Sequence, residues 1–198
     1  MRSQLDGEPE GLRWFEAQLA AASTVLGELG LPTHVEGELA PGARSRAMLD
    51  SFPYSFLHFL RHAYAWARQR AGEPLPELER LGRAEQARIE DEIGMLDSHL
   101  ILHSDCDGLY VPVDFGAPIH DPRLAGETLG STQRLEAELT LIAPLLGVEL
   151  VSGEVSDEAM AALDVEDDDP LHREKLVFAT LWEACRLSLA HRCAIVFH

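Results

Sequence analysis

The sequence contains little of what disulfide-rich folds, zinc fingers or membrane spans require. Its 198 residues include three cysteines, Cys106, Cys185 and Cys193, and no C-x-x-C spacing. An odd number of unpatterned thiols excludes a disulfide framework and favours reduced cysteines in the cytoplasm. No apolar run approaches the roughly 18 residues of a membrane helix, and the first residues, MRSQLDGEPEG, are too polar for a signal peptide. We therefore expect a cytoplasmic protein with no membrane partner.

Positive charge is also scarce. Sixteen Lys and Arg residues, of which only Lys175 is a lysine, oppose 34 Asp and Glu residues, so the net charge is −18. Such an excess repels nucleic acid and anionic membranes, and it attracts basic proteins. An acidic, arginine-biased composition can also arise without any functional reason, so composition alone leaves two interpretations open.

The common catalytic signatures are missing. The sequence has no G-x-S-x-G elbow, no glycine-rich phosphate loop and no H-E-x-x-H pair. We expect no catalytic residues, no bound metal and no cofactor.

The hydrophobic fraction of 46% and the length are typical of one globular domain, residues 1–198. Within it, residues 1–96 are expected to be a helical N-terminal lobe and residues 97–198 a mixed part with helices and strands. The predicted class is α+β, a helix-rich α/β arrangement. About five helices are expected to cover one side of a small, mostly antiparallel sheet.

Apolar residues at helical spacing, with capping and stop signals, locate the helices. Ser51 and Ser131 are the expected caps of the second and fourth helices, and Asp169-Pro170 is the expected start of the last one. Pro144 should end the fourth helix, and Ser156 should begin a brief one. The predicted long helices cover residues 8–29, 51–70, 76–95, 131–147 and 170–191.

The stretch HSDCDGLYVPVDF, residues 103–115, has the period of a strand. Leu109, Val111, Val113 and Phe115 alternate with other residues, and Asp107-Gly108 is a preferred turn dipeptide. This predicts a hairpin over residues 99–115 with a short final strand, 193–197, beside it. Pro112 has no N–H to donate, which indicates an edge strand or a bulge.

An alternative enzyme site would combine this stretch with residues 58–62. Two histidines four residues apart, in HFLRH, have the spacing of helical metal ligands, but two ligands do not make a zinc site. Both lie away from the apolar face of their helix, so we expect them to point to solvent or to a partner, without a metal. The aspartates beside the only nearby thiol disfavour its thiolate. A metal- or cysteine-dependent enzyme would use His58, His62, His103, Asp105, Cys106 and Asp107.

The most acidic stretch lies near the C-terminus. Residues 154–174 contain nine acidic residues and one basic residue, Arg173. It is either a solvated loop or a docking surface for a basic protein, because clustered carboxylates accelerate association with basic partners. Our prediction is a non-catalytic binding protein of the immunity or inhibitor type, which neutralises a basic partner protein. Its partner-binding residues would be Glu154, Asp157, Glu158, Asp164, Glu166, Asp167 and Asp168.

Overall fold

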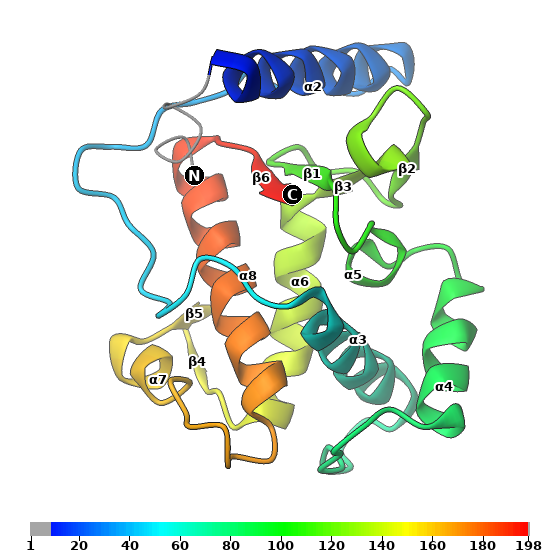
Figure 1. Ribbon diagram of the computed structural model, residues 1–198, viewed down its shortest axis with the longest axis vertical. Helices are drawn as coiled ribbons and strands as arrows, with labels where there is room; N and C mark the ends of the chain where they lie inside the picture. Colours follow the sequence, from blue (N-terminus) through cyan, green and yellow to red (C-terminus); the bar gives the residue numbers. More distant parts are fainter. Residues whose placement is uncertain (1–8, 198) are drawn as a thin grey trace.

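The computed structural model describes residues 9–197, and its elements form an α+β fold, as predicted. Figure 1 labels them along the chain. The helices are α2 (Pro9–Glu28), α3 (Tyr54–Gln69), α4 (Arg83–Ile93), α5 (His99–Leu102), α6 (Thr132–Ile142), α7 (Asp157–Ala161) and α8 (His172–His191). The strands are β1 (Gly108–Val111), β2 (Ile119–His120), β3 (Thr128–Ser131), β4 (Leu150–Val151), β5 (Glu154–Val155) and β6 (Ile195–Phe197).

Four short strands form one mixed sheet in the order β2-β3-β1-β6. Strand β1 pairs in parallel with β3 and antiparallel with β6, and β2 pairs antiparallel with β3. Two of the three pairings are thus antiparallel, and the C-terminal strand lies beside β1 as predicted. Strands β4 and β5 form a separate two-stranded hairpin.

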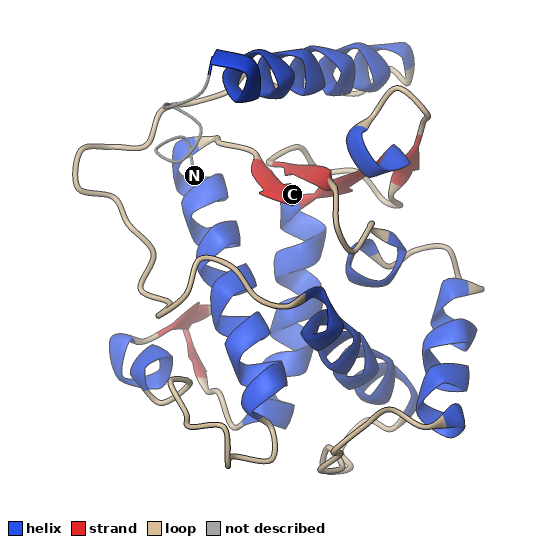
Figure 2. Ribbon diagram, viewed as in Figure 1, coloured by secondary structure: helices blue, strands red, loops and turns tan. Residues whose placement is uncertain are grey.

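Helices cover the sheet on both faces, and not on one face as expected (Figures 1 and 2). On one face α2 packs through Phe15, Ala22 and Leu26 against Leu109 and Val111 of β1. The opposite face continues into the larger core between α3, α6 and α8, which includes Tyr110 and Ile195. Alternate residues of β1 therefore point to opposite faces of the sheet, and both faces are buried.

The predicted hairpin over residues 99–115 is wrong. His99–Leu102 is a single helical turn, capped by Ser98, whose hydroxyl accepts a hydrogen bond from the Ile101 amide. Strand β1 pairs with segments distant in sequence, and it is a central strand that ends just before Pro112. The predicted burial of alternate residues is confirmed, since Leu109, Val111, Val113 and Phe115 are all buried in one core cluster.

Several helix boundaries follow the predicted signals, but α8 begins at His172, with Leu171 and not Asp169 at its N-cap. The hydroxyls of Ser131 and Ser156 cap α6 and α7 by accepting hydrogen bonds from backbone amides. A 3₁₀ turn containing Pro144 follows α6 and ends at Gly147, which has positive φ. Helix α3 begins at Tyr54 rather than Ser51. Helix α4 covers only the second half of the predicted range, residues 83–93.

Candidate functional site

The predicted docking residues belong to a compact unit at one end of the molecule. We call residues 149–169 the acidic cap; it consists of the β4–β5 hairpin, α7 and the loop that leads to α8. No lysine or arginine occurs between Arg134 and Arg173. The cap's acidic residues are Glu149, Glu154, Asp157, Glu158, Asp164, Glu166, Asp167, Asp168 and Asp169.

Apolar side chains fix the acidic cap to the protein core. Val155, Met160 and Leu163 are 2%, 4% and 4% exposed, and all three belong to the large core cluster. Because these residues point inward, the acidic ones between them point outward. The loop before α8 is also tied down, since the Asp169 carboxylate accepts hydrogen bonds from the Leu171 amide and from Lys175 at 2.6 Å.

Most carboxylates of the acidic cap have no cationic partner. Two are paired: Asp157 with Arg46 at 2.8 Å, and Asp169 with Lys175. For the other seven, no Lys, Arg or His side chain within residues 9–197 lies at ion-pair distance, and all seven residues are exposed. Burial, with a smaller contribution from the charge of Glu154, raises the pKa of Glu136 on α6. The surface therefore holds concentrated, largely uncompensated negative charge.

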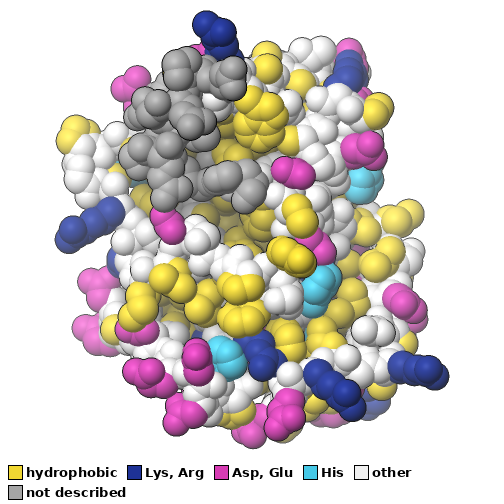
Figure 3. Space-filling view, in the orientation of Figure 1, with side chains coloured by type: hydrophobic (Ala, Val, Ile, Leu, Met, Phe, Trp, Pro, Cys, Tyr) yellow, Lys and Arg dark blue, Asp and Glu magenta, His cyan; other side chains and the backbone are white. Residues whose placement is uncertain are grey.

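Figure 3 shows this surface directly. Acidic side chains gather at the lower left of the view, over the region where Figure 1 places α7 and the β4–β5 hairpin. Apolar side chains lie immediately beside them. The seven residues predicted to bind the partner, among them the paired Asp157, thus lie on one unit. Their role stays a prediction.

Arg46 connects the acidic cap to the long loop between α2 and α3. Its guanidinium donates hydrogen bonds to the Val155 carbonyl, to Asp157 and to Glu183 of α8. The Glu183 side chain is fully buried. Burial by itself would raise the pKa of Glu183, but hydrogen bonds from Arg186 and Arg46 outweigh it and lower that pKa. Sequence reasoning gave no signal for this contact, because its partners are more than 100 residues apart.

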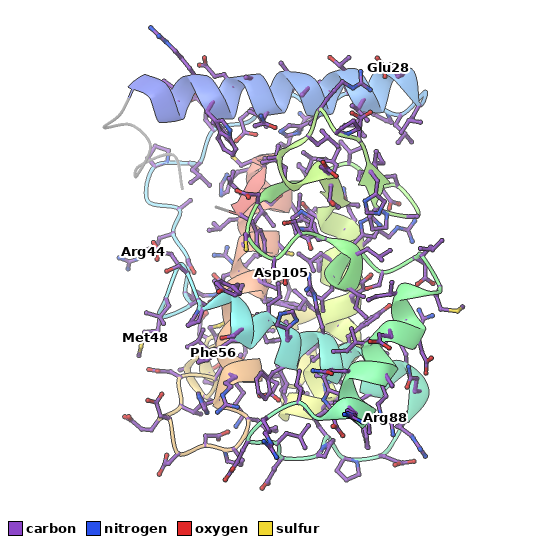
Figure 4. The ribbon with its side chains drawn as sticks, turned by 45° about the vertical axis from the view of Figure 1, so that its right-hand side comes forward. Glu28, Arg44, Met48, Phe56, Arg88 and Asp105 are labelled. Carbon is purple, nitrogen blue, oxygen red and sulfur yellow. The ribbon has the colours of Figure 1, made fainter. Side chains whose placement is uncertain are left out.

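The residues of the alternative enzyme site do not converge on one point. His58 lies 3.4 Å from Asp105, which also pairs with buried Arg61. Arg61 in turn donates to the carbonyls of Leu100 and His103, so these contacts fix the loop after α5. Figure 4 shows Asp105 near the middle of the view, away from Arg44 and Met48 at its edge.

Cys106 and Asp107 are exposed, and their backbone amides both point to the Ser104 hydroxyl. His103 is buried and stacks on Tyr110 with ring centroids 4.0 Å apart. Burial lowers the pKa of His103 to about 4, although both of its ring nitrogens face carbonyl oxygens. These contacts organise a turn, and among the described residues no three His, Cys, Asp or Glu side chains are arranged to hold a metal ion.

The predicted exposure of His62 is wrong. His62 is fully buried beside Trp66, and neither ring nitrogen has a hydrogen-bond partner within the described part of the chain. The helical-wheel argument failed because α3 is enclosed by other helices on several sides, so that even Arg61 and Tyr64 are buried. His58, one turn earlier, is about half exposed.

A groove of about 660 Å³ lies between α3 and α4. Phe56, Phe59, Leu81 and Ile89 form much of its apolar lining. The Arg173 guanidinium lies 4.5 Å from the Phe59 ring centroid and donates to the Glu79 carbonyl. The groove therefore already accommodates a cationic side chain of this chain.

No helix within residues 9–197 combines the length and the apolar character that crossing a membrane would require. A family model described as "Putative DNA-mimic protein" matches residues 1–197. No curated protein and no solved structure matches this chain.

Proposed function

We propose that this chain, which belongs to the DNA-mimic family, binds a basic DNA-binding protein through the acidic cap and thereby occupies its DNA site. The observation that carries the proposal is the set of seven exposed carboxylates, unpaired within residues 9–197, on one anchored unit that lacks any lysine or arginine. The fold keeps these charges together without neutralising them.

The physical basis is the charge of DNA itself. Duplex DNA carries about one negative charge per 1.7 Å of helix axis, and proteins bind it largely by neutralising phosphates with Lys and Arg. A carboxylate offers the same side chains a charge-assisted, often bidentate acceptor. Val155, Met160 and Leu163 hold the backbone beneath the carboxylates, so less of the binding free energy is lost to ordering a flexible segment.

The finer proposal is an inhibitor of the immunity type. A basic protein that binds the acidic cap through its phosphate-contacting residues cannot present the same residues to DNA. Inhibition would then require no catalysis and one chain per blocked site.

The test neutralises part of the acidic cap. Glu166→Gln, Asp167→Asn and Asp168→Asn together remove three charges from a segment that carries no buried apolar side chain. Asp169 is retained because it holds Lys175 and the start of α8. We expect a slower association rate at low salt and a shallower dependence of that rate on salt, because the Debye length falls from about 10 Å at 0.1 M to about 3 Å at 1 M.

A control variant removes the same charge elsewhere. Glu77→Gln, Glu90→Gln and Asp91→Asn are exposed and lie on or next to α4, away from the acidic cap. Association is measured with a protein that the chain captures from the fraction of a cell extract retained on duplex DNA. A slowing by the first variant alone supports the proposal. An unchanged rate, or equal slowing by both variants, contradicts it.

A further inference from the structure

Three large apolar side chains within seven residues of the chain are exposed on the loop before α3 and at its first residue. Met48, Leu49 and Tyr54 are 68%, 44% and 62% exposed, and we call them the anchor patch. Figure 4 shows Met48 projecting outward from this loop. Their burial by a partner would remove apolar surface from water, so these residues are candidates for a contact with another protein.

The loop that carries the anchor patch contacts the acidic cap or its junction with α8 on both sides of the patch. Before the patch, Arg46 bonds to Val155 and Asp157 of the cap. After it, the Phe56 ring lies 5.8 Å from that of His172, at the start of α8 and three residues beyond the cap. Between these points the Leu49 carbonyl accepts a hydrogen bond from Thr180 of α8. The loop that carries the anchor patch is therefore attached to the acidic cap before the patch and to α8 at and after it.

We propose that the anchor patch is the apolar centre of the partner interface, and that its occupant is a part of the basic protein where apolar side chains border the cationic DNA-binding residues. This inference rests on the proposed function and adds a requirement to it. Charge alone would make any polycation a ligand. An apolar contact beside the charges selects partners that combine both features, because apolar burial strengthens binding independently of salt.

A second copy of this chain is the competing occupant, and charge argues against it. Joining two anchor patches would bring two acidic caps close together, each with seven unpaired carboxylates. Like charges at such an interface oppose association, whereas a basic partner gains from the same carboxylates. The surface is therefore complementary to a cation-rich protein and not to itself.

Two synthetic peptides with equal numbers of arginines test the proposal. In one the arginines alternate with serine, and in the other with leucine. Their dissociation constants are measured by fluorescence anisotropy at low and at high salt. The chain should bind the leucine peptide at least about tenfold more tightly, because burying one or two leucine side chains is sufficient for that factor. This preference should persist at high salt.

Paired variants then locate the preference. Met48→Ser with Tyr54→Ser should abolish it and leave the serine peptide's affinity unchanged. Ile93→Ser with Met95→Ser changes two comparably exposed apolar residues at the end of α4 and should have no effect. Circular dichroism checks that each variant folds.

The outcomes separate the two proposals. If the chain binds both peptides equally, or keeps the preference after Met48→Ser with Tyr54→Ser, the anchor patch is not a docking site, and the acidic cap can still bind cations. If neither peptide binds at low salt, the proposed function fails as well. Sedimentation showing a dimer that Met48→Ser dissolves would also overturn the inference, since the patch would then pair two copies.

Discussion

At the residue scale, His62 is the buried histidine with the least support in the fold, since neither of its ring nitrogens has a hydrogen-bond partner among residues 9–197. Burial lowers the pKa values of His62, His99 and His103, to about 4 for the last two. A histidine whose pKa is lowered by folding stabilises the fold fully above its unfolded value of about 6.5, and that contribution is lost as the pH falls below it. Glu138 acts in the opposite direction, because burial raises its pKa to about 7, so its contribution is lost as the pH rises toward that value.

His62→Leu isolates one of these contributions. The substitution removes two buried nitrogens that have no hydrogen-bond partner in the described part of the chain, each of which costs on the order of 1 kcal/mol. We expect the variant to be more stable than the wild type by about 1 kcal/mol near neutral pH, and by more near pH 5, where the buried imidazole would otherwise favour unfolding. Urea denaturation of both proteins at both pH values measures the difference between their free energies of unfolding. Because Glu138 is present in both proteins, its contribution cancels. Equal destabilisation at both values would mean that His62 is hydrogen-bonded in the fold.

At the scale of elements, the loop between α2 and α3 has no helix or strand and is held by contacts with α8. Arg46 is its main attachment, through two hydrogen bonds from its side chain to the buried Glu183 and one from its backbone amide. The exposed pair between Arg46 and Asp157 should contribute little, since solvent screens it. The loop's position, and with it the anchor patch, therefore depends in part on one buried carboxylate, beside the hydrogen bonds that Arg186 and Thr180 donate to the loop carbonyls of Arg44 and Leu49.

Arg46→Ala should lower the free energy of unfolding by about 2 kcal/mol. Removing one partner of a buried ion pair usually costs about 3–5 kcal/mol, and Arg186 remains bound to Glu183 and limits the loss. Arg44→Ala is the control, because Arg44 is exposed on the same loop and the substitution keeps its carbonyl oxygen, which accepts a hydrogen bond from Arg186. Equal effects of the two substitutions on thermal unfolding would contradict the role given to Arg46.

Some helices and strands could be predicted from the sequence, and others could not. Local signals located the caps at Ser131 and Ser156, the long helices and the C-terminal strand, because a cap and a helical stripe depend on neighbours in the chain. The hairpin over residues 99–115 failed because β1 takes its partners from β3 and β6, which local pattern cannot identify. The acidic segment was recognisable from composition. The anchor patch was not, since exposure at Met48 depends on how a loop without periodicity packs on α8.

At the scale of the whole molecule, the charge of −18 is distributed unevenly. Elsewhere many carboxylates are paired with arginine, as Asp121 and Glu28 are with Arg123, whereas the acidic cap has no lysine or arginine of its own. A field of one sign over one surface steers a basic protein toward that surface and repels DNA and further copies of the chain. We therefore propose that a cationic partner approaches the face that carries the acidic cap.

The central claim is that the chain and DNA compete for the same site on the partner. The direct measurement uses a protein captured by the chain from the DNA-retained fraction, bound to a fluorescently labelled duplex, and follows the anisotropy of the duplex as the chain is added. We predict complete release of the duplex, with the Glu166→Gln, Asp167→Asn, Asp168→Asn variant requiring a higher concentration. A complex that contains duplex, partner and chain together, with the anisotropy undiminished at saturation, would contradict the account.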